Sequence, residues 1–530
     1  MMKQRIIGID LGTTNSCVAV WEGTEVTVIE NLEGQKVTPS VVSFTPSGRK
    51  IGESAKRQSA LFPELTIRSV KRLMGESYDS MRERLGQFSY KVIRGRNGNA
   101  AISIENSPIL PQQVSAYILS YLRSCAERYL GETVTEAVIT VPAYFSETQR
   151  QATKEAARIA GLNVRRLLNE PTAAALAYCE SGMNLGTIVV FDLGGGTFDI
   201  SMLNCTDDIY DVFANGGDTA LGGDDIDKAL TDELKIDFLS QCEKDIKLGP
   251  EQEMRLREEA EKVKMALSFE TTAELSLPWL APESRKNPHL VRTLSRTMVS
   301  DMAGPVVSRC REICMETLQK AHVDTADIDH VLLVGGSTKM PCIREMVEGV
   351  YHRKPVFSQD ADLIVAVGAA IEGAILSGAI RNKQLLDETP LALGVMTKGR
   401  IFDVIIEPNT TIPVSRTIRY ECASPDQQAV SIIVVQGRNA YDPKRKRVGC
   451  FDIMDIRSTE AGVPEVDVTF DIDPNGLLTV SAKDVKSGNA NSKVIGNANV
   501  LSDKEIESMR SSLSSATDDS LPLKQEPGML

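Results

Sequence analysis

Two stretches of the chain decide the fold: residues 9–14 are IDLGTT and residues 191–197 are FDLGGGT. Each follows an apolar run and brings Asp, Leu, Gly and Thr together at a turn. Glycine lets backbone N–H groups approach a phosphate closely, and threonine hydroxyls donate to phosphate oxygens. A carboxylate at a strand end is a ligand type that Mg²⁺ prefers, often through water. One such turn is compatible with a simple hairpin, but two predict a clamp that holds a triphosphate from both sides.

The first 380 residues alternate strand-like and helix-like segments, which indicates an α/β architecture. Apolar runs predict strands at residues 6–9, 137–141, 188–191 and 331–334. Residues 146–161 predict a helix, because Ser146 and Gln149 form a capping box and Gly161 suits the C-cap position. A third Gly-rich turn, residues 335–339, lacks the GxxxxGK[ST] spacing of a P-loop, so that class is rejected.

After about residue 389 the pattern changes to short alternating strands. Residues 465–472 place apolar side chains on one face, residues 473–476 form a turn, and residues 477–482 form the returning strand. Residues 429–435 predict another strand. This half is therefore expected to be an all-β domain of roughly 110 residues. One C-terminal helix follows, opened by a Ser502–Glu505 capping box with Ile506, Met509 and Leu513 on one side.

The composition excludes several classes. The 530 residues carry a net charge of −13, which does not suit a duplex-DNA binder. The one basic run, residues 444–447, has two interpretations, a nuclear localisation signal or a solvated loop between strands, and we favour the loop. The N-terminus lacks the apolar core of a signal peptide, and the longest apolar stretch, residues 363–380, is too broken to span a bilayer. We expect a cytoplasmic protein that binds neither nucleic acid nor membrane.

The cysteines and histidines do not indicate a metal site. The ten cysteines form no CxxC pair and no dense framework, which favours reduced thiols. Cys310 and Cys314 share a helical face, but without a nearby histidine a packed face is favoured over zinc.

Taken together, these motifs resemble the Hsp70 molecular chaperones, in particular DnaK-like members. The resemblance covers about residues 4–510, and it is carried by residues 9–16 (IDLGTTNS), 139–150 (ITVPAYFSETQR), 169–175 (NEPTAAA), 191–199 (FDLGGGTFD) and 333–341 (LVGGSTKMP). It implies an α/β actin/hexokinase-like ATPase domain, an all-β sandwich that binds peptide, and one short C-terminal helix. The implied segments are a nucleotide-binding domain (1–382), a linker (383–388), a substrate-binding domain (389–500), a lid remnant (501–515) and a disordered tail (516–530).

The resemblance also assigns residues to the ATPase site. The implied catalytic set is Lys71, Asp10, Glu170, Asp192, Asp199 and Thr197, with Asp10, Asp192 and Glu170 around the metal, largely through water. Lys71 matches the lysine that contacts the γ-phosphate and the attacking water, and Asp199 matches a carboxylate of the water and K⁺ network. The implied ATP-binding set is Gly12, Thr13, Thr14, Gly194, Gly195, Gly196, Thr197, Glu261, Lys264, Ser268, Gly335, Gly336, Ser337 and Asp362.

Further positions match residues that connect the two domains or contact partners. The interdomain switch matches Pro142, Arg150 and Asp387, and co-chaperone docking matches Arg166 and Asn169, together with Asp387. The walls of the peptide groove match Val395, Thr397, Lys398, Tyr420, Ala423, Val430, Ile432 and Ile472. Such a groove binds an extended apolar peptide through backbone hydrogen bonds and a side-chain pocket.

The function implied is that of an ATP-dependent chaperone of the stress response, whose ATP hydrolysis controls binding and release of unfolded segments. Its cofactors would be ATP or ADP, Mg²⁺ and K⁺, and its partners unfolded polypeptides, a J-domain co-chaperone and a nucleotide exchange factor. The alternatives are an actin-like filament former and a sugar-kinase-like phosphotransferase. Neither needs an appended β-domain with an apolar groove. A degenerate ATP-binding scaffold is disfavoured, because the whole phosphoryl-transfer set is present.

The chain departs from the family pattern at the linker, the groove and the lid. Lys383 and Gln384 stand where the linker is usually apolar, and Lys398, opposite Ala423, stands where an apolar residue usually arches over the peptide. Lys339 and Met265 replace other residues beside the base. We expect one short helix in place of most of the helical lid. We therefore expect weaker coupling between the domains and faster peptide release.

Overall fold

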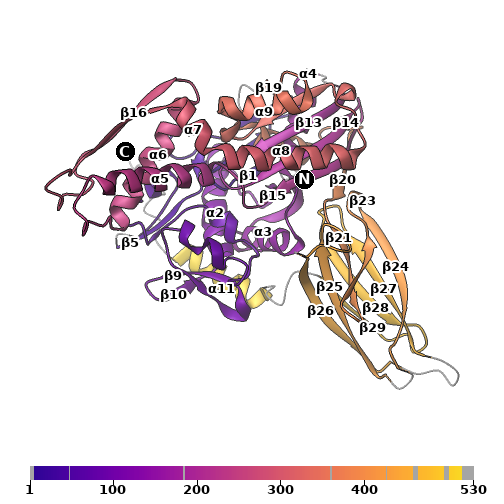
Figure 1. The fold of residues 1–530 in the computed structure, drawn as a ribbon. Helices are drawn as coiled ribbons and strands as arrows, with labels where there is room; N and C mark the ends of the chain where they lie inside the picture. Colours follow the sequence, from indigo (N-terminus) through magenta and orange to yellow (C-terminus); the bar gives the residue numbers. More distant parts are fainter. Residues whose placement is uncertain are drawn as a thin grey trace, which may run out of the picture.

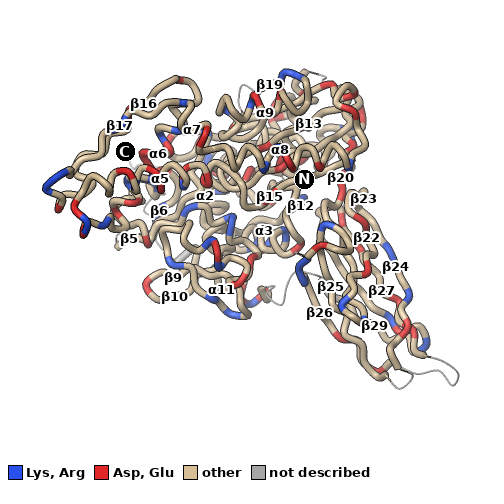
Figure 2. Tube along the Cα trace, in the orientation of Figure 1, with Lys and Arg blue, Asp and Glu red and all other residues tan. Residues whose placement is uncertain are grey.

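The computed structural model describes residues 5–46, 48–182, 185–357, 361–424, 427–443, 445–456, 463–494 and 501–515. A large α/β body carries an elongated β-domain, which projects from it on one side (Figure 1). The α/β body consists of two lobes, each built on one sheet. Basic and acidic residues are interspersed over both parts of the molecule rather than separated by sign (Figure 2).

The first lobe is built on a six-stranded sheet with β1 near its centre. Five of its strands follow the order β12-β11-β1-β2-β3, and β4 pairs with β2. Their bounds are β1 (Ile6–Leu11), β2 (Asn15–Trp21), β3 (Val26–Val28), β4 (Thr38–Pro39), β11 (Glu136–Val141) and β12 (Asn163–Asn169). The apolar residues of β1 are buried, as the sequence predicts, and β1 pairs in parallel with β11 and antiparallel with β2. Helices α2 (Pro111–Leu130) and α3 (Glu147–Ile159) pack in this lobe.

The second lobe is built on a seven-stranded sheet in the order β19-β18-β13-β14-β15-β20-β23. Its strands are β13 (Gly186–Leu193), β14 (Phe198–Cys205), β15 (Ile209–Asp218), β18 (His330–Val334), β19 (Val356–Phe357), β20 (Gln384–Thr389) and β23 (Thr410–Ile412). Its main helices are α5 (Gly223–Ser240), α6 (Pro250–Leu267), α7 (Arg296–Met302), α8 (Gly304–Ala321) and α9 (Pro341–Tyr351). Cys310 and Cys314 are both buried on α8, which confirms a packed face.

Two helices cross where the lobes meet, α4 (Glu170–Gly182) and α10 (Ile364–Ser377). The crossing depends on small residues, since a Cβ at Gly368 would lie 1.8 Å from the Ala173 carbonyl oxygen. A Cβ at Gly8 of β1 would likewise lie 2.2 Å from the Ala370 backbone nitrogen. The longest apolar stretch is therefore a core helix. Within the described ranges, none of the helices is long and apolar enough to cross a membrane.

Smaller elements complete the two lobes. Two three-stranded sheets and one hairpin are formed by β5 (Val42–Thr45), β6 (Gly48–Ile51), β7 (Thr66–Ile67), β8 (Val92–Arg94), β9 (Ala100–Ile104), β10 (Ser107–Ile109), β16 (Thr272–Leu277) and β17 (Leu290–Ser295). Short helical turns are α1 (Glu53–Lys56), η1 (Val70–Leu73), η2 (Arg82–Gln87), η3 (Arg96–Gly98), η4 (Thr325–Asp327) and η5 (Gly336–Lys339).

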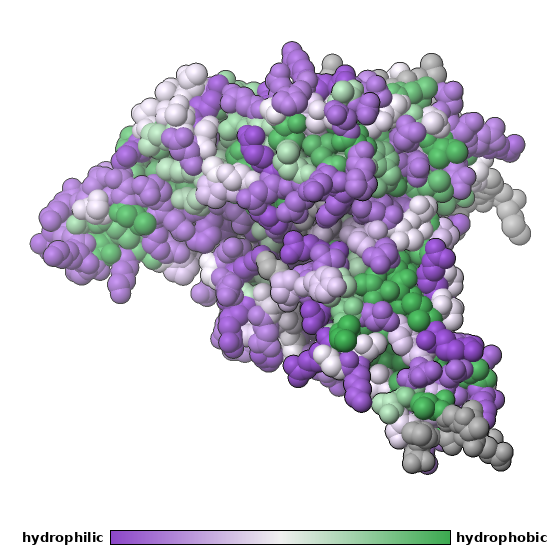
Figure 3. All heavy atoms as spheres, turned by 45° about the vertical axis from the view of Figure 1, so that its right-hand side comes forward, coloured by the Kyte–Doolittle hydropathy of each residue, from purple (hydrophilic) through white to green (hydrophobic). Residues whose placement is uncertain are grey.

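The β-domain is a sandwich of two four-stranded sheets, in agreement with the alternating sequence pattern. One sheet contains β21 (Ala392–Thr397), β22 (Ile401–Ile406), β25 (Ala429–Gly437) and β26 (Lys446–Met454). The other contains β24 (Val414–Glu421), β27 (Glu465–Ile472), β28 (Leu478–Asp484) and β29 (Ala490–Val494). Their inner faces share one apolar cluster. Hydrophobic side chains also gather on the outside of this domain close to the α/β body (Figure 3).

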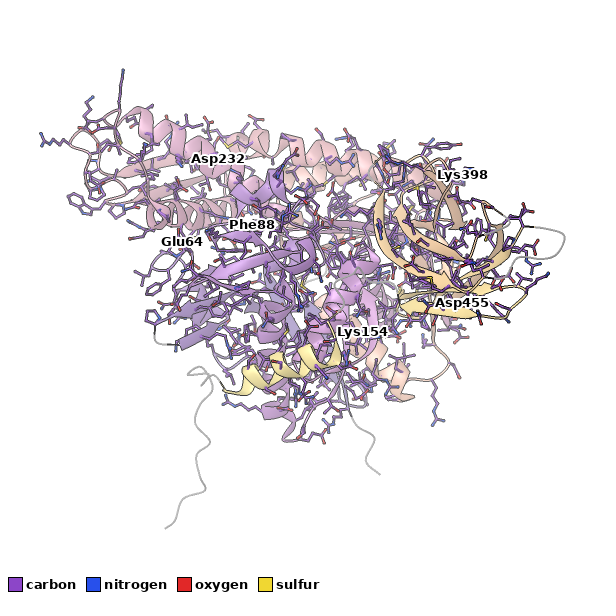
Figure 4. All side chains as sticks on the ribbon, turned by 90° about the horizontal axis from the view of Figure 1, so that it is seen from below. Glu64, Phe88, Lys154, Asp232, Lys398 and Asp455 are labelled. Atoms are coloured by element: carbon purple, nitrogen blue, oxygen red, sulfur yellow. The ribbon has the colours of Figure 1, made fainter. Side chains whose placement is uncertain are left out.

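Both ends of the β-domain are anchored on the α/β body. The residues expected to form the linker are strand β20, which pairs in parallel with β15 and antiparallel with β23. The C-terminal helix α11 (Asp503–Ser515) packs against α3, where Leu501 and Ile506 join the apolar core of the first lobe. Figure 4 shows α11 on the side of Lys154 of α3, away from Lys398. Residues 516–530, expected to be a disordered tail, lie outside the described residues.

Two local predictions need correction. Helix α3 has Ala160 at its C-cap, and Gly161 follows it with a φ of +78°. The basic run is not a solvated loop throughout, because β26 begins at Lys446, whose Nζ lies 2.9 Å from Glu76 Oε1 of the first lobe. Arg447 is also part of this strand. Lys444 lies outside the described residues.

Candidate functional site

The two phosphate-type turns face each other between the lobes, as the sequence predicts. A Cβ at Gly195 would lie 2.0 Å from Thr14 Oγ1, and a Cβ at Gly196 would lie 2.4 Å from Thr13 Cγ2. The second turn is closed by the Gly194 N–H, which donates to the Thr197 carbonyl at 3.1 Å. In the first turn, a Cβ at Gly12 would lie 2.1 Å from the Asn15 carbonyl oxygen. Side chains larger than glycine would therefore fill the space between the turns.

Four carboxylates and one lysine gather at the ends of β1, β13, β14 and β12. Lys71 is 5% exposed, and its ammonium group forms an ion pair with Glu170. Burial and the charge of Glu170 raise the pKa of Asp10 to about 7. The same two causes, in the same order, raise the pKa of Asp192 well above its ordinary value and that of Asp199 to about 8. One lysine does not neutralise this set, so the site attracts further positive charge.

Asp199 is held by the loop that follows β11. Its Oδ1 accepts a hydrogen bond from the Tyr144 N–H at 3.1 Å, and the Ala143 N–H also donates to it. Asp199 lies directly across from Asp192, because the two residues are partners in the β13–β14 register. Asp10 is positioned in a different way, by the Thr140 hydroxyl, which donates to Asp10 Oδ1 at 2.9 Å.

The residues expected around adenosine lie on three elements of the second lobe. Glu261 accepts from Arg68 at 3.1 Å, Lys264 pairs with Asp227 at 2.7 Å, and the Ser268 hydroxyl donates to the Lys264 carbonyl. The third Gly-rich turn contacts the turn at residues 191–197, because the Ser337 hydroxyl donates to the Gly194 carbonyl at 2.9 Å.

The same turn also reaches Asp192 and Asp362. Gly335 has a φ of +84°, and a Cβ there would lie 2.7 Å from Asp192 Oδ1. At Gly336 a Cβ would lie 3.7 Å from Asp362 Oδ1, and Asp362 pairs with Lys339 at 2.6 Å. Met265 is exposed, so it does not line the packed part of the site.

Sequence reasoning missed the N-terminus of α5 and its contacts across the cleft. The Gly223 N–H donates to the Gly194 carbonyl at 3.0 Å, and a Cβ at Gly223 would lie 2.5 Å from Ser337 Oγ. Arg72 of the first lobe pairs with Asp225 at 2.7 Å, and the Ser69 hydroxyl donates to Asp224 at 2.6 Å. A signal was present in residues 222–225, Gly-Gly-Asp-Asp, at a helix start.

The site suits a nucleotide phosphate chain, because it contains buried hydroxyl donors that have no hydrogen-bond partner among the residues that the structure describes. Thr13 Oγ1 and Thr14 Oγ1 are buried, and neither has a hydrogen-bond partner within the described part of the chain. Buried hydroxyls without partners are costly, and a phosphate oxygen would satisfy them. Within the same residues, no group of three or more His, Cys, Asp or Glu is arranged to hold a metal directly. The excess negative charge of the four carboxylates fits a cation.

The switch residues form one buried network beneath β20. The Asn169 amide donates to both carboxylate oxygens of Asp387, at 2.9 and 2.8 Å. Arg150 donates to Asn169 Oδ1 at 2.6 Å and to the Ala143 carbonyl at 3.2 Å. Arg166 pairs instead with Glu372 of α10 at 2.7 Å. Pro142 is buried at the start of the loop that holds Asp199. The structure therefore brings Arg150, Asn169 and Asp387 together and leaves Arg166 beside them.

The unusual linker residue Lys383 has a partner that the sequence did not indicate. Its ammonium group lies 3.0 Å from Glu180 Oε1 of α4 and 5.6 Å from the centroid of the Tyr210 ring. Gln384 is exposed, whereas Leu385 is 8% exposed and belongs to the apolar core. An ion pair and one apolar anchor thus hold the linker strand, in addition to its ladders with β15 and β23 and the hydrogen bonds from Asn169 to Asp387.

Five residues expected in the peptide groove lie in one apolar cluster of the β-domain: Val395, Tyr420, Val430, Ile432 and Ile472. The Tyr420 hydroxyl donates to Asp403 at 2.6 Å, and the Thr397 hydroxyl donates to the Ile401 carbonyl at 3.3 Å. Lys398 and Ala423 are exposed.

Comparison with protein families identifies the chain. A model of the family described as Hsp70 protein matches residues 6–525. The chain belongs to the Hsp70 family. Hsp70 proteins are ATPases that act as molecular chaperones, bind ATP or ADP with Mg²⁺, and interact with unfolded polypeptides and co-chaperones. The chain is therefore an ATP-dependent chaperone of this family.

Proposed function

We propose that this Hsp70 protein couples Mg²⁺-dependent ATP hydrolysis to the binding and release of extended apolar peptide segments by its β-domain. A J-domain co-chaperone and a nucleotide exchange factor would set the rates of hydrolysis and of nucleotide release. The observation that carries the proposal is the buried contact route from Asp199 to the linker, because it joins the ATP cleft to the β-domain.

Each residue of the cleft has a distinct role in this proposal. Thr13, Thr14 and Thr197 donate hydroxyl hydrogen bonds to phosphate oxygens. Lys71, oriented by Glu170, offsets the negative charge that develops on the transferred phosphoryl group. Bound Mg²⁺ would supply the remaining positive charge, held through water by the Asp10, Asp192 and Glu170 carboxylates. Asp199 would orient the attacking water and contribute to a K⁺ site.

The route to the β-domain runs through one loop and one helix. Asp199 accepts from the Ala143 and Tyr144 backbone, and Arg150 donates to the Ala143 carbonyl. Arg150 then contacts Asn169, which donates to Asp387 of the linker strand. A change in the hydrogen bonds of Asp199 would therefore bias the position of Arg150 and the docking of β20. Asn169 is part of this route and Arg166 lies beside it, which supports the proposal that a J-domain docks there.

The groove side of the proposal rests on the apolar residues of the β-domain. Val395, Ile432 and Ile472 are closely packed in the docked state, so binding would need the domain to open locally. The actin-like and sugar-kinase-like alternatives leave the β-domain and its buried connection to the cleft without a role.

The test is peptide-stimulated ATP turnover. Asn169→Ala removes both hydrogen bonds to Asp387 and should lower the stimulation by an unfolded apolar peptide severalfold. Asn163→Ala is the matched control, because the Asn163 side chain is exposed on β12 and donates to Glu136 of β11 at 3.0 Å, away from Asp387. Stimulation by a sugar rather than by peptide, or equal peptide stimulation in both variants, would contradict the proposed coupling.

A further inference from the structure

The β-domain sheet formed by β22, β21, β25 and β26 is apolar on both of its faces. Strand β25 contains four consecutive apolar residues, Ile432 to Val435. Successive residues of a strand point to opposite faces, so two of the four lie on the outer face of the sandwich. An antiparallel sheet with one face in water normally alternates apolar and polar residues. The pattern of β25 therefore indicates that the outer face contacts something other than water.

This outer face carries an apolar cluster of its own, separate from the sandwich core. Its members come from β21, β22 and β25, and three are buried while three are half-buried: Ala392, Phe402 and Val435, and Met396, Val404 and Ile433. The half-buried members leave apolar surface in contact with water. Figure 3 shows hydrophobic side chains on the outside of this domain close to the α/β body.

The residues expected in the peptide groove lie on the opposite face of the same sheet. Val395 and Ile432 belong to the sandwich core. Their neighbours in sequence, Met396 and Ile433, belong to the outer cluster. A ligand on the outer face would therefore leave the groove residues free.

Three arginines from three different segments lie at this outer face. Arg447 of β26 is directly opposite Val435 in the β25–β26 ladder, so the two side chains share the face. A Cβ at Gly437, at the end of β25, would lie 3.0 Å from the Arg445 Cβ. The Arg445 guanidinium donates to the Arg400 carbonyl in the β21–β22 turn at 3.4 Å. Arg400 itself is exposed.

The positive charges of these arginines are not neutralised by the protein. Within the part of the chain that the structure describes, none of the three forms an ion pair, and Arg445 donates to backbone carbonyls instead. Asp442 is buried and pairs with Arg438 at 3.7 Å. Asp452 shares the outer face but lies toward the other end of β26. In a chain of net charge −13, this face therefore attracts acidic groups.

We propose that the outer face of this sheet is a second binding surface of the chaperone, which docks an acidic and apolar segment of a partner protein. Apolar side chains of the segment would cover Met396, Val404 and Ile433, and its carboxylates would pair with Arg445 and Arg447. Arginine suits this role, because its planar group pairs with a carboxylate while its stem packs on apolar surface. The proposal depends neither on ATP hydrolysis nor on the peptide groove.

The experiment measures binding of a fluorescein-labelled peptide, Glu-Glu-Leu-Ile-Leu-Glu-Glu, to the full chain by fluorescence anisotropy. An excess of an unlabelled, uncharged apolar peptide keeps the groove occupied. A second measurement locates the bound peptide by the rate at which iodoacetamide alkylates Cys450, the partner of Ile433 on the outer face. Cys342 of α9 is the reference thiol, because it is half-buried like Cys450 but lies in the second lobe.

Two variants remove parts of the surface and one serves as a control. Arg447→Gln removes a charge, and Ile433→Thr removes apolar surface while keeping a β-branched residue in the strand. Arg419→Gln is the matched control, because Arg419 lies on the outer face of the other sheet and already pairs with Asp467 at 2.8 Å. Circular dichroism checks that each variant is folded.

The acidic peptide should bind the wild type with the groove filled, and its affinity should fall as salt rises. We expect the affinity to fall about threefold in Arg447→Gln and about fivefold in Ile433→Thr, and to stay unchanged in Arg419→Gln. Bound peptide should slow the alkylation of Cys450 and leave that of Cys342 unchanged.

Three kinds of result would overturn the proposal. The first is no binding of the acidic peptide, or its complete displacement by the groove peptide. The second is equal affinity in all variants, or alkylation of Cys450 that bound peptide does not slow. The third is a different occupant that depends on Arg447 in place of the peptide: phosphatidylserine vesicles, oligouridine, or a second copy of the chain detected by sedimentation.

Discussion

The carboxyl group of Glu147 should make docking of the β-domain depend on pH. Glu147 is the first residue of α3, and its Oε2 accepts a hydrogen bond from the Leu478 N–H of β28 at 3.0 Å. Its own N–H donates to Gln436 Oε1 of β25 at 3.3 Å. Burial raises its pKa from the ordinary value of 4.5 to about 7, with Asp473 raising it further and Arg150 opposing the shift. Undocking would expose this carboxyl to water.

The sign of this pH dependence follows from which state, docked or undocked, binds the Glu147 proton more tightly. The docked state holds the proton up to about pH 7 and the undocked state only up to about pH 4.5, so docking is favoured at low pH and weakens as pH rises. Between pH 6 and pH 8 the difference is about 1.4 kcal/mol, or about tenfold in the docking equilibrium. This range also avoids the isoelectric point, which is near 5.1.

The assay is amide hydrogen exchange of strand β20, corrected for the intrinsic pH dependence of exchange. In the wild type, protection of these amides should fall about tenfold more between pH 6 and pH 8 than in Glu147→Gln. Burial also raises the pKa of Asp387 and Glu388, but both remain in the variant, so the difference isolates Glu147. Glu258→Gln, at a carboxyl of α6 whose pKa is also raised by burial, is the control. Equal pH dependence in wild type and Glu147→Gln would refute the reasoning.

Three further predictions concern catalysis, peptide release and packing. Lys71→Ala should lower the ATP turnover rate at least about a hundredfold while ATP binding, measured by calorimetry, largely remains, and a wild-type rate would exclude Lys71 from catalysis. In the ADP state, a fluorescent apolar peptide should be released within seconds in a stopped-flow experiment and should bind with micromolar or weaker affinity. Basic peptides should bind more weakly than apolar ones, because Lys398 repels them. Release over many minutes would contradict the prediction of fast release. Gly368→Ala should lower the unfolding free energy by about 1–3 kcal/mol, because its Cβ would meet the Ala173 carbonyl at 1.8 Å, while Gly86→Ala, with open space around it, should be neutral in thermal denaturation.

The sequence predicted the strands that carry the phosphate turns, because their apolar runs and glycines leave few alternatives. The α/β body, the alternating strands of the β-domain and the capping boxes of α3 and α11 were predicted for the same local reasons. The pairing of Asp10 with Thr140, or of Glu170 with Lys71, was not predicted, since the residues are far apart in the chain. The family resemblance only assigned Asp10, Lys71 and Glu170 to the same site.

The contacts between the two parts of the molecule could not be predicted from sequence patterns. Lys383 departs from an apolar pattern, yet Glu180 gives it a partner, because α4 ends beside the linker strand. Lys446 belongs to a basic run typical of loops, yet it pairs with Glu76 across the two parts. Such ion pairs depend on how distant segments are placed in the folded chain. Hydrophobic periodicity and turn residues do not predict that placement.

The C-terminal helix has a consequence for how the β-domain moves. The β-domain is held by β20 at its start and by α11 at its end, so it is tethered at two points to the same body. When one attachment opens, the other keeps the released segment at a high effective concentration, of the order of millimolar for short connections. Re-docking is then an intramolecular event that outpaces capture by dilute partners. In this chain the last helix therefore acts as a second tether that limits how far the β-domain can move from the α/β body. It does not cover the groove, because it packs on α3.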